Sequence, residues 1–314
     1  MDESDTDRKS KGNQSHVAVF CSPHNPCGRV WESAEIEQAM EIYRNNDCLV
    51  ISDEIWSDLL LFGNKHIPTQ SVSEDARRRT VALYAPSKTF NLAGLVGSYH
   101  IIYDSYLRDR VAAKASKSHY NAMNVLSMHA LIGGYSETGA AWVDALCEVL
   151  SANVDYACRY IAEHFAGVKV SRPQGTYMLF LDCTDWCAAH GKTIDWVEQA
   201  GWDVGVAWQD GRMFHGPCAI RMNLALPLSR VQEAFERLDR HVFNAGFSRL
   251  GAKTKKSEIC KTAACAAVGP QYVKFYGMLK RRAARMAARR FCLCSMCRFQ
   301  RQQLPFDGQP GGVP

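Results

Sequence analysis

The sequence predicts an α/β protein in which short buried strands alternate with helices. Three apolar runs, at residues 16–21, 48–52 and 80–84, are too short for helices and each leads into a polar or proline-containing segment. A segment of helical periodicity begins at Ser33, between the first two runs. Strands that alternate with helices typically form a mainly parallel sheet, with ligand-binding loops along one edge.

Length and composition indicate a globular body without a membrane span. The chain has 314 residues, of which 47% are hydrophobic and 22% charged, enough for one large domain or two smaller ones. No apolar run reaches the roughly 18 residues of a membrane helix. Residues 1–15 are polar and resemble neither a secretory signal nor a transit peptide. We therefore expect a disordered lead at 1–15, a cytoplasmic protein and no membrane partner.

The charge is divided unevenly between the body and the tail. Residues 1–248 carry 23 Lys and Arg against 30 Asp and Glu, a net charge of −7. Residues 249–314 carry 14 against 2, a net charge of +12. The chain's overall charge of +5 describes neither part, so it gives no reason to expect that the body binds nucleic acid.

The body is expected to contain two domains. Residues 16–150 would form the larger one, with a further strand at 97–103 and helices throughout 105–165. Its strand at 48–52 is apolar enough to be buried on both faces. Residues 151–248 would form a smaller α+β domain, and the boundary would lie within or beside a helix. Its expected elements are a strand at 175–181, a helix at 194–200, a strand at 219–225 and a helix capped by Ser229 that ends at His241.

Four polar residues are candidates for a common site. Asn25, Asp53 and Lys88 each follow a predicted strand end, and Arg221 lies on a strand of the smaller domain. Each has an ordinary explanation alone: a turn asparagine, a capping aspartate, a solvated lysine and a surface arginine. Together they match the needs of a pyridine aldehyde cofactor. These are an amine for the Schiff base, a carboxylate for the ring nitrogen, an amide for the ring hydroxyl and a guanidinium for the substrate carboxylate.

Four sequence runs resemble one enzyme family. They are SPHNPCGRVW at 22–31, ISDEI at 51–55, APSKTFNLAG at 85–94 and IRMNLA at 220–225. These runs, in this order, are similar to the class I/II aminotransferase family of fold type I. The first and third runs are most similar to its cystathionine β-lyase and C–S lyase subgroup. The resemblance covers roughly residues 16–245. It implies a partial large domain with a mainly parallel sheet, followed by a small α+β domain.

The resemblance also implies a cofactor and a role for each candidate residue. The cofactor would be pyridoxal 5′-phosphate, and Lys88 would form the Schiff base and then remove the substrate α-proton. Asp53 would pair with the ring nitrogen and Asn25 with the ring hydroxyl. Arg221 would bind the substrate carboxylate. Ser87 would help to hold the phosphate, unless it is an ordinary loop hydroxyl. Members of the family form homodimers, and no metal is implied.

The implied function is cleavage of a carbon–sulfur bond in a small amino acid. After the α-proton is removed, loss of a sulfur group from Cβ gives pyruvate, ammonia and a thiol, as in a cystathionine β-lyase or a cysteine-S-conjugate β-lyase. Return of a proton to the cofactor would instead give an aminotransferase. The four candidate residues serve both outcomes, and only the subgroup resemblance favours the lyase. A catalytically inactive truncated homologue is the third reading.

The chain departs from the family pattern in several ways. Only 24 residues precede Asn25, where family members have a much longer segment that includes a phosphate loop and an aromatic residue against the ring. We therefore expect an N-terminally truncated form with exposed sheet edges. Trp56 stands where relatives usually carry Tyr or His, and Ala85 stands where many place a phosphate-binding Ser. Val96 replaces an arginine that is common in the aminotransferase branch.

The tail at 249–314 matches nothing in the family. Residues 280–290 would suit a basic helix for nucleic acid or an acidic membrane. Cys292, Cys294 and Cys297 are a weak candidate for a metal site. We favour the simpler interpretation of a disordered, solvated extension. The eight cysteines of the body show no paired spacing, which favours buried thiols over a disulfide scaffold.

Overall fold

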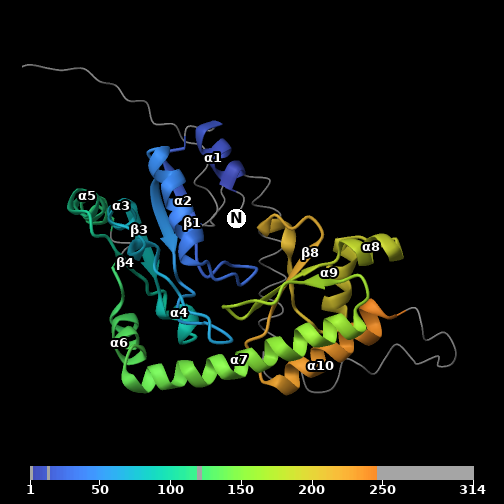
Figure 1. Ribbon diagram of the computed structural model, residues 1–314. Coiled ribbons are helices and arrows are strands. Elements are labelled where there is room, and N and C mark those ends of the chain that lie inside the picture. Colours follow the sequence, from blue (N-terminus) through green and yellow to red (C-terminus); the bar gives the residue numbers. More distant parts are fainter. Residues whose placement is uncertain (1–2, 13–14, 119–121, 246–314) are drawn as a thin grey trace, which may run out of the picture. The chain divides into compact units, whose positions relative to one another are not determined.

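The computed structural model describes residues 3–12, 15–118 and 122–245. All of them belong to one compact unit, which comprises Met1–Ser248. This unit contains two four-stranded sheets, in the orders β1-β2-β3-β4 and β5-β6-β8-β7 (Figure 1). The predictions of a basic helix at 280–290 and of a metal site at Cys292, Cys294 and Cys297 lie outside the described residues.

The first sheet is mainly parallel, as predicted. Strands β1 (Val17–Cys21), β2 (Leu49–Asp53) and β3 (Thr80–Tyr84) run parallel, and β4 (Tyr99–Ile101) is antiparallel to β3. Helix α2 (Ser33–Asn45) connects β1 to β2. A small core joins this helix to the sheet and comprises Phe20, Ile36, Ala39, Met40, Tyr43, Cys48, Val50 and Ala76.

The prediction that the strand at 48–52 is buried on both faces is wrong. Val50 and Ser52 are fully buried, but Leu49 is 42% exposed. The same alternation occurs on β1, where Phe20 is buried while Val17 and Val19 are 52% and 70% exposed. Successive side chains of a strand point to opposite faces, and in the described residues only one face of these strands is packed under a core. The first sheet therefore presents apolar side chains on its other face.

The second sheet is antiparallel throughout. It contains β5 (Lys169–Val170), β6 (Met178–Asp182), β7 (Gln209–Asp210) and β8 (Ala219–Asn223). The sequence did not predict the two short strands β5 and β7. Its helices are α7 (Glu137–His164), α8 (Thr184–His190), α9 (Ile194–Asp203) and α10 (Leu228–Leu238).

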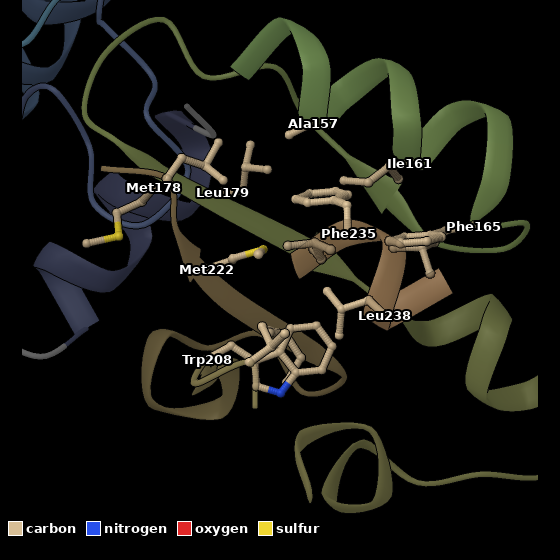
Figure 2. Close-up of a cluster of buried hydrophobic side chains, with 14 of the residues drawn as sticks. Ala157, Ile161, Phe165, Met178, Leu179, Trp208, Met222, Phe235 and Leu238 are labelled. Atoms are coloured by element: carbon tan, nitrogen blue, oxygen red, sulfur yellow. The ribbon is translucent and has the colours of Figure 1, made fainter. Parts of the chain in front are cut away.

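The core of the second region is dense and aromatic. Figure 2 shows part of it, where Phe165, Phe235 and Leu238 lie with Trp208 and Met222 among other apolar side chains. The Phe165 and Phe235 rings stack with their centroids 5.8 Å apart. Helix α7 contributes an apolar face that includes Val143, Leu150, Val154, Ala157 and Ile161.

Residues 3–12 correct one prediction. They form helix α1 (Glu3–Gly12), where we expected part of a disordered lead. The helix pairs Asp5 with Arg8 and with Lys9, at spacings that place these side chains on one helix face. Asn46 at the end of α2 donates a hydrogen bond to Asp7 at 2.9 Å, which ties α1 to the body. Polar composition was therefore a poor guide to order here.

The segment at 105–165 contains helices, as predicted, and the described residues form three of them. They are α5 (Ser105–Ala115), α6 (Val125–Gly134) and α7, and the side chains of Asp104, Asn124 and Ser136 cap their N-termini. Helix α6 ends at Gly134, and α7 begins at Glu137. The expected residue-150 boundary lies inside α7 and stays a prediction.

Two helices of the body differ from the predictions. Pro227, not Ser229, is the N-cap of α10, and a π-helical turn (Asp239–Phe243) completes the expected segment. Helix α3 (Glu74–Arg79), capped by Ser73, is a helix that the sequence did not predict. The remaining elements are α4 (Pro86–Thr89) and the 3-10 turns η1 (Thr69–Ser71), η2 (Ala93–Leu95) and η4 (Gly211–Phe214). Of the described helices, none is both long and apolar enough to cross a bilayer.

Candidate active site

Three parallel strands of the first sheet end side by side and lead into the predicted site residues. Cys21 lies opposite Asp53, and Asp53 lies opposite Leu83. Backbone hydrogen bonds continue past the strand ends, from Ser22 N–H to the Asp53 carbonyl at 3.1 Å and from Glu54 N–H to the Leu83 carbonyl at 3.0 Å. The parallel register therefore brings the loop that carries Asn25, the residue Asp53 and the segment that leads to Lys88 to one edge of the sheet.

Asp53 has a carboxylate that is half-buried and has spare acceptor capacity. Its Oδ1 accepts a hydrogen bond from the Ile55 N–H at 3.2 Å, and none of the described residues donates to Oδ2. Burial raises the pKa of Asp53 above its ordinary value, and the positive charge of Lys88 opposes this rise. A protonated ring nitrogen would satisfy such a carboxylate.

Asn25 and Arg221 are separated by 196 positions in the sequence but touch in the structure. Arg221 donates a hydrogen bond from one guanidinium nitrogen to Asn25 Oδ1 at 3.0 Å, and the other nitrogen bonds Gln209. The guanidinium lies over the Phe214 ring, 4.5 Å from its centroid. Burial lowers the pKa of Arg221, an effect that Tyr177 opposes. The second sheet thus contributes directly to the candidate site.

Lys88 lies beside a pair of packed aromatic residues, Trp56 and Tyr177. Lys88 Nζ lies 5.7 Å from the centroid of the Trp56 ring. Trp56 in turn meets Tyr177 edge to face, with centroids 4.7 Å apart. Burial raises the pKa of Tyr177, and the positive charge of Arg221 partly opposes this rise. Sequence reasoning missed Tyr177 as a site residue, although its place within the strand predicted at 175–181 was a usable signal.

Glu54 is a second feature that sequence reasoning missed. Its side chain is fully buried, and four donors surround the carboxylate. They are Tyr84 Oη at 2.6 Å, His66 Nε2 at 2.7 Å, Ser52 Oγ at 2.8 Å and the Thr69 N–H at 3.0 Å. Burial opposes ionisation, but the bonds from His66, Tyr84 and Ser52 outweigh it and lower the pKa of Glu54. An ionised Glu54 therefore anchors the end of β2 directly beside Asp53.

The segment before Lys88 offers few groups that could bind the cofactor phosphate. Ser87 is half-buried in α4, and its carbonyl accepts a hydrogen bond from the Leu92 N–H at 3.0 Å. Ala85 is the buried N-cap residue of the same short helix, so no hydroxyl stands at that position. The role of Ser87 in phosphate binding stays a prediction.

The donor set suits the ring end of pyridoxal phosphate. Asp53 keeps a free carboxylate oxygen, Lys88 supplies an amine near an aromatic ring, and the amide NH₂ of Asn25 is available because Arg221 occupies its oxygen. For the phosphate end, the described residues offer the Ser87 hydroxyl. The residues that are present therefore fit the cofactor at its ring, and this fit supports their predicted roles without testing them.

A parallel sheet that carries a lysine and a carboxylate at adjacent strand ends, followed by a small antiparallel sheet with an arginine, defines a fold type I scaffold. The sequence matches the family "Aminotransferase class I and II" over residues 2–238. It is 30% identical over 241 residues to cystathionine beta-lyase PatB of Bacillus subtilis, covering 76% of this chain and 61% of PatB. It is 32% identical over 225 residues to protein MalY of Escherichia coli, covering 69% of this chain and 55% of MalY.

A solved structure supports the same assignment. The crystal structure of cystalysin from Treponema denticola, which contains pyridoxal 5′-phosphate, is 30% identical and superposes with a TM-score of 0.71, covering 76% of this chain and 61% of cystalysin. The chain belongs to the class I and II aminotransferase family, whose cofactor is pyridoxal 5′-phosphate. It spans about three fifths of the length of PatB and cystalysin. The predicted family, fold class and family cofactor are thus confirmed.

Proposed function

We propose that this chain is a pyridoxal-phosphate-dependent C–S β-lyase. It would cleave the Cβ–S bond of cystathionine or of a cysteine S-conjugate and release pyruvate, ammonia and a thiol. The observation that carries the proposal is the meeting of two sheets at one site. Asp53 and the segment of Lys88 follow adjacent strands of the first sheet, while Arg221 of the second sheet donates to Asn25 at 3.0 Å.

Each residue would have a separate task. Pyridoxal phosphate, when bound, acts as an electron sink for the substrate Cα. Asp53 would hold the ring nitrogen in its protonated form, and the Asn25 NH₂ would donate to the ring hydroxyl. Lys88 would attach the cofactor and then take the proton from the substrate Cα. Arg221, held by Gln209 and Phe214, would bind the substrate carboxylate.

The choice of β-lyase over aminotransferase depends on the relatives. PatB is named as a cystathionine β-lyase, and the sequence resembles that subgroup at residues 22–31 and 85–94. The site residues themselves serve both reactions. A lyase forms pyruvate from cystathionine without any second substrate, whereas an aminotransferase needs a 2-oxo acid to accept the amino group. An inactive homologue would do neither.

The proposed test combines labelling of the lysine with product analysis. The full chain is incubated with pyridoxal phosphate, reduced with borohydride and digested, and the phosphopyridoxyl group is located by mass spectrometry. We expect it on Lys88, and we expect Lys88→Ala to remove it together with pyruvate formation from cystathionine. Lys117→Ala, which changes an exposed lysine of the same body, is the matched control and should keep both.

The outcomes separate the three readings. Labelling of Lys88 with pyruvate formation supports the lyase. Labelling with turnover only in the presence of a 2-oxo acid indicates an aminotransferase. Labelling without either reaction, or no labelling of the wild-type chain, contradicts the proposed activity. We also expect a small amino-acid substrate, a cytoplasmic location and a homodimer, and these three stay predictions.

A further inference from the structure

One cysteine of the body differs from the others in its surroundings. Burial raises the pKa of six of the eight described cysteines, namely Cys21, Cys48, Cys147, Cys158, Cys183 and Cys187. Cys27 instead lies 3.0 Å from a histidine ring nitrogen, His24 Nδ1. A thiol paired with an imidazole is the arrangement that generates a nucleophilic thiolate.

The loop that carries this pair is closed by its own backbone. The Gly28 N–H donates to the His24 carbonyl at 2.7 Å, and the His24 N–H donates to the Arg29 carbonyl at 2.8 Å. Gly28 has a φ of +69°, and a Cβ there would lie 2.4 Å from Pro173. The turn therefore requires glycine at this position, and the bonds on either side of it hold His24 and Cys27 together.

The surroundings of His24 and Cys27 include an aromatic ring and an arginine whose side chain bonds other residues. His24 and Cys27 are both half-buried rather than enclosed in a core. Trp31 contacts the His24 ring edge to face, with centroids 6.4 Å apart. Arg29, two residues after Cys27, donates to Glu35 at 2.8 Å and to Gln174 at 2.7 Å.

The electrostatics favour ionisation of the thiol. Burial works against the Cys27 thiolate, but the hydrogen bond with His24 and the Arg29 backbone N–H outweigh it and lower the pKa of Cys27. Cys21 is the neighbouring thiol, and burial raises the pKa of Cys21 to about 11, so Cys21 stays protonated at neutral pH. The two cysteines of this region should therefore differ sharply in reactivity.

We propose that Cys27 and His24 form a reactive thiol site that undergoes exchange with disulfides of small thiols. The Cys27 proton passes to His24 Nδ1, and the Cys27 Sγ attacks one sulfur of the incoming disulfide. The disulfide bond breaks as the new Cys27–S bond forms, and the departing thiolate takes the proton back from His24. The product is a mixed disulfide on Cys27 and one free thiol, with no net oxidation or reduction.

The site lies close to the candidate active site. Cys27 is two residues from Asn25, whose side-chain oxygen accepts the hydrogen bond from Arg221. The inference concerns a residue outside the proposed lyase machinery, so it is tested by labelling rather than by activity.

The experiment measures the reactivity of each cysteine by mass. The full chain is reduced, desalted and treated at pH 6.5 with a limiting amount of iodoacetamide, and peptides are quantified over time. We expect Cys27 to react at least about tenfold faster than Cys158, which is also half-buried. His24→Gln should remove this advantage, whereas His129→Gln, on an exposed helix position, should keep it. A parallel incubation with glutathione disulfide should place the mixed disulfide on the peptide that contains Cys27.

Several results would overturn the proposal. Equal labelling of Cys27 and Cys158 in the wild-type chain would contradict it, and this comparison needs no variant that folds. An unchanged rate for Cys27 in a folded His24→Gln variant would show that the imidazole does not activate the thiol. Alkylation of Cys27 without any mixed disulfide would exclude exchange. None of these outcomes depends on pyridoxal phosphate, so failure here and failure of the lyase proposal are distinguishable.

Discussion

The two sheets of this protein are built from similar elements but are stabilised differently. One cluster of 28 buried apolar residues lies mainly in the second region, joined by Trp56, Leu59 and Leu61 of the first region, whereas the core of the first sheet has eight. The first sheet also leaves Val17, Val19 and Leu49 substantially exposed on one face. The first region also contains a buried polar cluster around Glu54. The region with the larger core contributes Arg221, and the region with the smaller core carries most of the chemistry.

This difference shows where stability and function are separated along the chain. A dense apolar core stabilises a region without constraining the residues at its strand ends. A sheet with a small core depends more on directed hydrogen bonds, which also fix side chains beside Asp53 and Lys88. We therefore expect substitutions in the second region to act mainly on folding. Substitutions at the strand ends of the first sheet should affect folding and the site together.

The largest effect on stability is expected from the aromatic core of the second region. Phe235 is fully buried and stacks on Phe165, so Phe235→Ala leaves a cavity and should cost about 3–5 kcal/mol of unfolding free energy. Val19→Ala, at a strand residue that is 70% exposed, should cost less than about 0.5 kcal/mol. Urea unfolding of both variants measures the contrast. A Val19→Ala effect as large as that of Phe235→Ala would remove the proposed difference between the regions.

A second prediction concerns the polar cluster of the first sheet. Glu54→Gln replaces one acceptor oxygen by a donor that faces donors, so it should lower the unfolding free energy by about 1–3 kcal/mol at pH 7. Because the folded-state pKa of Glu54 is below 4.5, its stabilising contribution is present above that pH. The contribution is lost as the pH falls through the folded-state value.

The variant should therefore approach the wild type in stability under acid conditions. Urea midpoints at pH 7 and near pH 4 measure this change. Glu41→Gln, at a glutamate whose side chain is 62% exposed, is the matched control and should have little effect at either pH. A cost of Glu54→Gln that does not change with pH would mean that the Glu54 charge is not what stabilises the cluster.

The sequence predicted those parts of the site that follow local patterns. Asp53 follows an apolar run directly, and Asn25 and Lys88 lie within four residues of the ends of two others. Parallel pairing of such runs brings their ends together. The observed register confirms that the ends of these strands lie side by side. The contact between Asn25 and Arg221 depends on packing between elements that are 196 residues apart, and no periodicity of the chain encodes it. Only the family resemblance suggested that these two residues belong to one site.

Most of the missed features depend on tertiary packing, and helix α1 is the exception. Glu54 collects donors from Ser52, His66, Thr69 and Tyr84, at irregular separations that no pattern relates. The exposure of Leu49 has a similar origin, because the sequence of an apolar strand is the same whether one or both of its faces are covered. Helix α1 was missed because its support comes from short-range charge pairs rather than from an apolar face. Local composition therefore predicted element types better than it predicted burial.

The smallest effect should have the opposite sign and comes from the residue next to Glu54. Burial raises the folded-state pKa of Asp53 above its ordinary value, so ionising Asp53 is harder in the folded chain than in the unfolded chain and costs stability at neutral pH. The stability that protonated Asp53 contributes is present below its unfolded-state pKa and is lost as the pH rises through its folded-state pKa. Asp53→Asn should therefore stabilise the chain without cofactor at pH 7, by on the order of 0.5 kcal/mol.

The same substitution should lose this advantage in acid, where Asp53 is protonated in both states. Thermal unfolding at pH 7 and pH 3.5 measures the difference, and Asp144→Asn, at an exposed helix position, is the matched control. Destabilisation by Asp53→Asn at pH 7 would show that its carboxylate is anchored like that of Glu54. The two adjacent carboxylates would then share one structural task. Stabilisation would instead mark Asp53 as a group held ready for a partner that the chain itself does not supply.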